Sequence, residues 1–386
     1  MQKMKYLFEI IRYNLEGGDC PILSENVDWE ALYKICKFHK IESVVAHGLE
    51  RMDDREQIPE EIWKKFERSW QMETARDATQ QLSLEELLAA FENAGVYCLP
   101  LKGVFMKQCY PQTDLRMMAD LDLLFRLEQE KEVDEILLKQ GYHCHQRDDH
   151  HHIYYRKPFM NVEMHYRLVE EDNPFASYYK DPWERAKEFD GKKYIYQYGW
   201  EDFYIFFIVH MVKHFENGGI GIRSVVDIWQ FEKKMKNEMD WAYVEKELEQ
   251  LGLKKFLHHM EKLALIWFED KQSTEFYNQL TELIIGSGVY GTMDNYWVQN
   301  VATADRNARF GQIKVWLSTI FFPYSAMKLQ YKYLEKYPVL LPIAWVQRIF
   351  RTIFLRRGKA RKVLAEQRAD LSKVRRSQEV FEKLGL

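Results

Sequence analysis

The sequence predicts an α+β protein in which a small mixed β-sheet is flanked by helical regions on both sides. Three observations lead to this prediction. Apolar residues recur at helical spacing over residues 1–95, short apolar runs of strand length follow over 96–198, and helical spacing returns over 199–386. A chain of 386 residues is long enough for more than one domain, and we expect these three segments to be the domains.

The first segment carries signals for where its helices begin and end. Residues 28–39 have apolar positions at helical spacing. Pro59 followed by two glutamates is typical of a first helical turn. The helical pattern continues through residues 70–93 and stops before Gly95, which fits a C-cap.

The central segment changes its period at Val96 and reads as β-α-β-α-β-β-β. Its strands are short apolar or alternating runs divided by polar or proline-containing turns. We expect strands at 96–101, 119–125, 142–146, 152–156 and 161–168, and helices at 104–109 and 128–140. This order is typical of a small mixed-sheet domain.

The last segment begins with a strongly apolar helix at 202–214, followed by a glycine-rich loop and a helix at 223–234. The net charge of the whole chain is −4, which excludes a global attraction to nucleic acid. We find neither a signal peptide nor an apolar run long enough to span a membrane, and therefore expect a cytoplasmic protein without a transmembrane segment.

The main candidate site lies in the central segment, where Asp120 and Asp122 are spaced i, i+2 in a predicted strand. Alternate residues of a strand share a face, so the two carboxylates are expected side by side. They repel each other and are costly to desolvate. A divalent cation that prefers oxygen ligands would compensate best.

Other residues of the central segment can complete this site. Glu163, on a neighbouring predicted strand, is the third carboxylate, as a metal ligand or a general base, and His165 shares its face. Lys102 and Gly103 stand where a strand gives way to a helix, a position suited to binding phosphate. Arg116 is expected to neutralise phosphate or to pair with the two aspartates.

Taken together, these residues resemble a known family. The runs that carry the resemblance are Leu101-Lys-Gly, Tyr110-Pro, Arg116 and Asp120-Leu-Asp-Leu-Leu, followed by His210, His214, Gly219-Ile-Gly-Ile-Arg-Ser-Val-Val-Asp227 and Phe321-Phe-Pro. Over about residues 80–350 the chain is similar to the uncharacterised nucleotidyltransferase family of bacteria, within the polymerase-β-type superfamily. The resemblance implies a nucleotidyltransferase core, Mg²⁺ or Mn²⁺, and a nucleoside triphosphate donor, with ATP favoured.

The resemblance leaves the acceptor and the activity open. The acceptor could be a protein side chain, a small molecule or an RNA end. The superfamily usually has Gly-Ser at the turn before the acidic pair, whereas this chain has Lys102-Gly103-Val104. Contact with phosphate must then come from backbone N–H groups and Lys102. The alternative is a non-catalytic nucleotide-binding or sensor module with the same fold.

Three further features have two interpretations each. The histidines at 143, 145, 150, 151 and 152 favour an exposed hairpin over a soft-metal site or the rim of an acceptor pocket. His214 is expected to line the nucleotide cleft, while Arg223 either pairs with Asp227 on the helix surface or faces the nucleotide. The basic and aromatic segment 345–362 favours a packed helix over peripheral contact with an anionic membrane.

Overall fold

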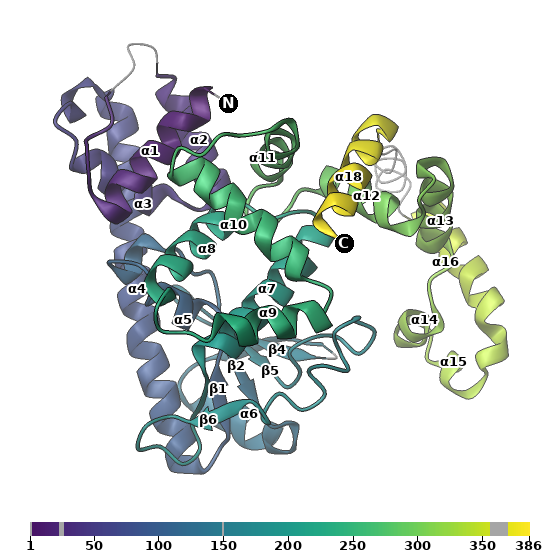
Figure 1. Ribbon diagram of the computed structural model, residues 1–386. Helices are drawn as coiled ribbons and strands as arrows, with labels where there is room; N and C mark the ends of the chain where they lie inside the picture. The colour runs from purple at the N-terminus through teal and green to yellow at the C-terminus, as the bar shows by residue number, and fades with distance from the viewer. Residues whose placement is uncertain (1, 23–26, 149, 356–369) are drawn as a thin grey trace. The chain divides into compact units, whose positions relative to one another are not determined.

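The computed structural model describes residues 2–22, 27–148, 150–355 and 370–386 (Figure 1). They form two compact units. The first comprises Met1–Met211 and Ile222–Thr274, and the second comprises Val212–Gly221 and Glu275–Leu386. The first unit holds the β-sheet together with helices on both sides of it in the sequence, which confirms the predicted α+β class.

The N-terminal helices begin and end at the residues that local chemistry favours. They are α1 (Gln2–Glu16), α2 (Trp29–His39), α3 (Glu42–Glu50) and α4 (Glu60–Ala94). The Asp28 side chain accepts a hydrogen bond from the backbone N–H of Ala31 and so caps α2. Gly95 ends α4 in a left-handed conformation with φ of 71°, which glycine adopts at little cost.

The main sheet has five strands in the order β1-β2-β5-β4-β3. The strands are β1 (Cys98–Pro100), β2 (Leu121–Phe125), β3 (His143–Arg147), β4 (His151–Arg156) and β5 (Met160–His165). The central pair β2–β5 is parallel, and the other three pairs are antiparallel. A mixed sheet was predicted, and the parallel central pair decides where the candidate site forms.

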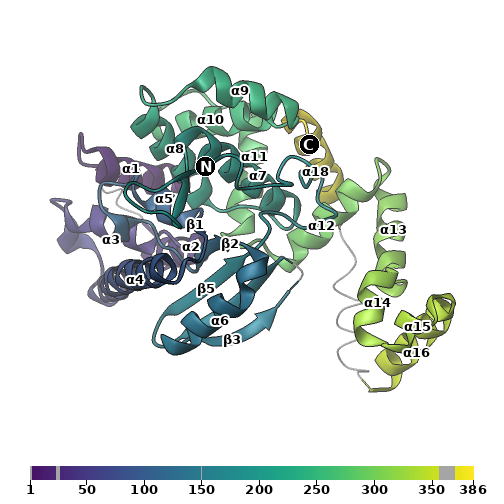
Figure 2. The ribbon, with the colours of Figure 1, turned by 90° about the horizontal axis from the view of Figure 1, so that it is seen from below.

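One face of this sheet is covered by helices and forms a hydrophobic core. Leu121 and Leu123 of β2 pack with Leu87 of α4 and with Leu137 of α6 (Glu130–Lys139). Figure 2 shows α6 lying along this sheet. Because side chains alternate across a strand, the intervening Asp122 lies on the opposite face. The apolar pattern of β2 therefore directs its acidic residue away from the core.

The remaining elements of the first unit are short, or follow the sheet in the sequence. They are α5 (Gly103–Lys107), β6 (Ala186–Glu188), β7 (Tyr196–Tyr198), α7 (Trp200–Glu216), α8 (Ile222–Met235), α9 (Trp241–Gln250), α10 (Lys254–Phe268) and the 3₁₀ turns η1 (Arg55–Gln57), η2 (Thr113–Leu115) and η3 (Leu127–Gln129). The last five residues of α7, from Val212 to Glu216, belong to the second unit. The small β6–β7 sheet was not predicted; its pairing is antiparallel.

The second unit is helical throughout its described part. Its helices are α11 (Glu275–Ser287), α12 (Met293–Ala304), α13 (Ala308–Ile320), α14 (Tyr324–Gln330), α15 (Tyr333–Lys336), η4 (Pro338–Leu340), α16 (Leu341–Leu355) and α18 (Leu371–Leu384). Two small apolar clusters hold them, one around Val301 and Val374 and one around Met327 and Leu334. Among the described helices, none combines the length and apolarity that crossing a bilayer requires.

Candidate active site

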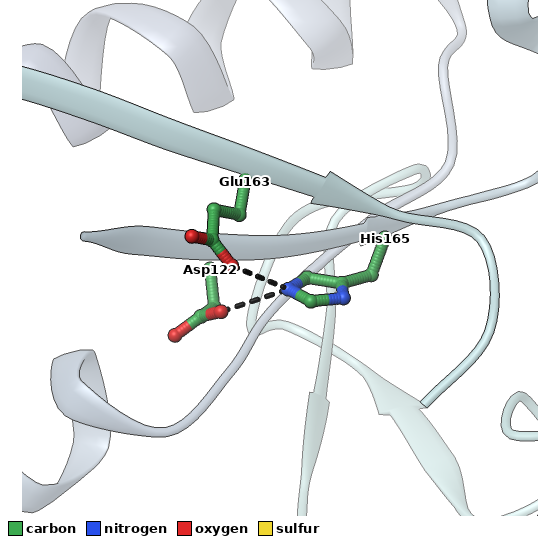
Figure 3. A group of neighbouring side chains, drawn as sticks. All are labelled: Asp122, Glu163 and His165. Carbon is green, nitrogen blue, oxygen red and sulfur yellow. Dashed lines mark hydrogen bonds and ion pairs between the residues drawn. The ribbon is translucent and has the colours of Figure 1, made fainter. Parts of the chain in front are cut away.

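The parallel pairing of β2 and β5 brings two predicted site residues side by side. Asp122 is the register partner of Glu163, so their side chains leave adjacent strands on the same face. His165 lies two residues beyond Glu163 and shares that face. Figure 3 shows the three side chains pointing toward one another. A strand from residue 119 was expected, but β2 begins at Leu121, so Asp120 lies just before the strand.

Asp122 is the centre of a buried network of charges. Its Oδ1 accepts hydrogen bonds from Lys102 Nζ at 2.9 Å and His165 Nε2 at 2.8 Å. Burial opposes ionisation of Asp122, but the Lys102 ammonium and the bond from His165 outweigh burial and lower the carboxyl pKa. Burial also lowers the pKa of His165 to about 4, so at neutral pH this imidazole is neutral and donates its Nε2 proton.

Asp122, Glu163 and His165 have the composition of a metal-binding group. One ligand atom from each lies within 4.8 Å of the others. Asp120 is close enough that the Asp122 charge, in addition to burial, raises its carboxyl pKa. Carboxylate oxygens suit Mg²⁺ and Mn²⁺, and an imidazole is compatible with the latter. The residues present therefore fit a divalent cation.

The turn before α5 holds Lys102 in an uncommon backbone conformation. Its φ is 40° and its ψ is −103°, in a region that side chains other than glycine rarely adopt. In this backbone conformation the Lys102 side chain forms an ion pair with Asp122. Strain of this kind is found preferentially at functional sites.

Gly103 is required by a neighbouring side chain. A Cβ placed there would lie 2.5 Å from Met118 Sδ and 3.4 Å from Arg116 Nη1. Close approach of a phosphate was the expected reason for this glycine. The structure adds a second reason, which is the packing of the loop that leads to Asp120.

Arg116 is committed to a partner that the sequence did not indicate. Its Nε and Nη2 donate to Asp227 Oδ1 and Oδ2 at 2.7 and 2.8 Å, and the Tyr110 hydroxyl donates to the same Oδ1 at 2.7 Å. Arg116 is 7% exposed and Asp227 2% exposed. This buried triad connects the loop before Asp120 to α8.

Arg223 therefore has a different neighbour from the one that helical spacing suggested. Its Nη1 donates to the backbone oxygen of Met117 at 2.9 Å, while Asp227 faces Arg116. The positive charge of Arg223 also acts on Asp120, opposing the rise in pKa that burial and Asp122 cause. Arg223 thus lies within electrostatic reach of Asp120.

The predicted histidines are divided among different surroundings. His143 and His145 are exposed on β3, as the hairpin interpretation expects. The ring of His151 instead lies 5.1 Å from that of His165. His151 was not among the predicted site residues, although the alternation of β4 could have indicated its neighbour once the pairing was known.

Two predicted binding features belong to the second unit, which is described by itself. His214 belongs to the second unit and its backbone oxygen accepts a hydrogen bond from the Gly219 N–H. Of segment 345–362, residues 356–362 lie outside the described residues, and the rest belongs to α16. The site described above therefore consists of residues from the first unit.

Parts of the chain are similar to solved structures of known proteins. No curated protein matches. Among solved structures, a solution structure of the antibiotic-resistance factor ANT(2'')-Ia is 14% identical over 47% of this chain and 99% of that chain, with a TM-score of 0.34. A crystal structure of ANT(2'')-Ia in complex with adenylyl-2''-tobramycin is 13% identical over 50% of this chain and 98% of that chain, with a TM-score of 0.26.

A protein-family model matches a longer part of the chain than the solved structures do. The family described as uncharacterised nucleotidyltransferase matches residues 25–269, which is more than half of the chain and includes every residue of the site in the first unit. The chain therefore belongs to this family and is a nucleotidyltransferase.

Proposed function

We propose that this nucleotidyltransferase transfers a nucleoside monophosphate from a nucleoside triphosphate, with ATP favoured, to an acceptor hydroxyl in a reaction that depends on Mg²⁺ or Mn²⁺. The acceptor oxygen forms a bond to the α-phosphorus. The bond from that phosphorus to the β-bridging oxygen breaks, and pyrophosphate leaves. The observation that carries this proposal is the register pairing of Asp122 with Glu163 next to Asp120.

Asp120, Asp122 and Glu163 would hold the cation. A bound divalent cation neutralises triphosphate charge and lowers the pKa of an attacking hydroxyl. His165 keeps Asp122 oriented by donating to its Oδ1 at 2.8 Å. Glu163, whose Oε2 is 3.6 Å from His165 Nε2, would serve either as a ligand of the cation or as the base that accepts the proton of the acceptor hydroxyl.

Lys102 and Arg223 would supply positive charge that neutralises the phosphates of the bound nucleoside triphosphate. The Lys102 ammonium is 2.9 Å from Asp122 just before α5. The N–H groups of Val104, Phe105 and Met106 already donate to backbone oxygens of Leu101 and Lys102, so the ammonium is the donor that remains for phosphate at this turn. Gly103 lets the loop from Arg116 to Asp120 pack closely against this turn. Arg116 acts through this loop rather than on phosphate, because its guanidinium is engaged by Asp227.

The test measures pyrophosphate release from each of the four common nucleoside triphosphates with Mg²⁺ or Mn²⁺, with cell extract as acceptor. We compare the wild type with Asp120→Asn/Asp122→Asn. Glu128→Gln/Glu132→Gln is the matched control, since it removes the same charge from exposed residues on the helix side of the sheet. Binding of Mn²⁺, followed by electron paramagnetic resonance, is measured on all three proteins.

The proposal expects release and Mn²⁺ binding by the wild type and the control, and loss of both by the double aspartate variant. Nucleotide binding without release by the wild type would favour the sensor alternative, which the absence of a Ser hydroxyl at Lys102-Gly103-Val104 motivates. Release that is unchanged in the aspartate variant would refute the proposed site.

A peripheral membrane contact is a separate proposal for the second unit. Ile343, Val346 and Phe350 are each about half exposed and lie at i, i+3 and i+7 on α16. Such a face can enter the headgroup region of a bilayer. The Arg348 guanidinium, however, donates to the Thr319 backbone oxygen at 2.9 Å and covers Phe322, so it serves packing. Co-sedimentation with anionic and zwitterionic vesicles tests this contact, and equal recovery in both pellets would refute it.

A further inference from the structure

The first unit has a cavity outside the site described above. Its volume is about 380 Å³, and its walls are formed by α2, the start of α3, the middle of α4 and the loop residue Met117. We call it the α2–α4 groove. Its basic lining residues are Lys37, Lys40, Lys65, Arg68 and Arg76.

The groove is lined by more basic than acidic residues, in a chain whose net charge is −4. Lys65 pairs with Glu30 at 2.7 Å and Arg76 with Glu73 at 3.6 Å. Five basic residues face two acidic ones, Glu42 and Glu73. Burial raises the pKa of both carboxyls, that of Glu73 to about 7, so near neutral pH they offset less than two charges. Within the described residues, Lys37 and Arg68 have neither a hydrogen bond nor an ion pair from their side chains.

The cations are arranged in a row. Lys65, Arg68, Met72 and Arg76 lie at i, i+3, i+7 and i+11 of α4, which is one face of the helix. At 1.5 Å per residue this row is about 16 Å long. Met72 stands in the middle of the row and is 45% exposed. The groove thus combines a line of positive charge with an exposed apolar side chain.

The groove ends close to the candidate active site. Met117 lines it, and the backbone oxygen of the same residue accepts the hydrogen bond from Arg223. Asp120 follows three residues later, which is at most roughly 10 Å along the chain. The loop is held against α3 and α4, because the Ser43 and Thr74 hydroxyls donate to Asp114 at 2.8 and 2.6 Å.

We propose that the α2–α4 groove binds the phosphodiester backbone of a single-stranded nucleic acid whose end is the acceptor hydroxyl. This inference rests on the proposed function and names its substrate class. A row of about 16 Å matches several successive phosphates of one strand better than a single triphosphate. Met72 provides a surface for a base or a sugar, and Lys102 remains available for the nucleotide.

The test measures binding of a fluorescein-labelled single-stranded RNA of about twelve nucleotides by fluorescence anisotropy, without nucleotide or metal, at about 50 and 200 mM salt. The groove variant is Lys37→Gln/Arg68→Gln. The matched control is Lys34→Gln/Lys64→Gln, which removes the same charge from exposed residues of the same two helices outside the groove. Asp120→Asn/Asp122→Asn is measured in parallel.

We expect the wild type, the control and the aspartate variant to bind alike, and the groove variant to bind about tenfold more weakly. Its plot of log affinity against log salt should be less steep by about 1.4, which corresponds to two phosphate contacts. Because nucleotide and metal are omitted, failure of transfer leaves this result intact. Absence of RNA binding would overturn the proposal. So would an equal loss of affinity in the groove variant and in the Lys34→Gln/Lys64→Gln control. Displacement of the labelled RNA by polyglutamate as effective as displacement by unlabelled RNA of the same charge would also overturn it.

Discussion

Replacing Asp227 with leucine tests whether the buried triad, rather than phosphate binding, accounts for Arg116. Asp227 receives both N–H groups of the Arg116 fork and the Tyr110 hydroxyl, at 2.7 to 2.8 Å. Removal of the carboxylate leaves a buried guanidinium without its counter-charge. Breaking a buried pair from one side costs about 3–5 kcal/mol.

The size of the expected effect follows from these contacts. For a unit of this size, about 2–4 °C is lost per kcal/mol, so Asp227→Leu should lower the melting temperature of the first unit by about 6–20 °C. Tyr110→Phe removes one hydrogen bond to a charged acceptor and should cost about 1.5–3 kcal/mol. The double variant Arg116→Met/Asp227→Leu removes both charges and should be more stable than Asp227→Leu alone.

The assay is urea unfolding followed by circular dichroism, with thermal melting as a second measure. The wild type, Arg116→Met, Asp227→Leu and the double variant form a double-mutant cycle. Nucleotide affinity is measured on each variant that remains folded. A loss below about 1 kcal/mol for Asp227→Leu, or a double variant whose loss equals the sum of the single losses, would refute the structural role. A large fall in nucleotide affinity of Arg116→Met at unchanged stability would restore the phosphate interpretation.

Three further predictions concern single residues. Gly103→Ala should cost about 1–3 kcal/mol and slow transfer, because Met118 must move; an unchanged urea midpoint would contradict the close packing. The folded-state pKa of Glu73, about 7, lies above the ordinary 4.5, so its contribution to stability is complete below pH 4.5 and is lost as pH rises through 7. Glu73→Gln should flatten this decline in pH-dependent melting curves. Lys102→Met should reduce kcat about 10²-fold and also lower stability, because it leaves the buried Asp122 carboxylate without its counter-charge; full activity would exclude a role for the ammonium.

The periodicity of the sequence was sufficient to predict the elements that build the sheet. All five strands of the main sheet were expected within a few residues, because alternation and flanking turn residues are local signals. The juxtaposition of Asp122 and Glu163 was also expected, since both lie among apolar strand residues that must face a core. Local pattern alone, however, did not establish that β2 and β5 are parallel.

The partner of Arg116 could not be read from the sequence. Asp227 is 111 residues away, and its i, i+4 spacing from Arg223 suggested a pair on the surface of one helix. The direction in which α8 turns its buried face decides between these partners, and that direction depends on tertiary packing. The sequence signal that this part of α8 is buried is the run of apolar neighbours Val225, Val226 and Ile228, which are buried in the structure.

Lys102 is the position where local and tertiary preferences disagree most clearly. Glycine would adopt a φ of 40° with less strain, whereas lysine there is costly on backbone grounds alone. Only the lysine side chain, however, places an ammonium 2.9 Å from a carboxylate that is 4% exposed. The ion pair with Asp122 thus offsets the backbone strain at Lys102. The strained turn also keeps the ammonium where it allows the buried Asp122 carboxylate to remain ionised. Such conflicts between levels are expected at functional sites, which supports the placement of the reaction at the end of this turn.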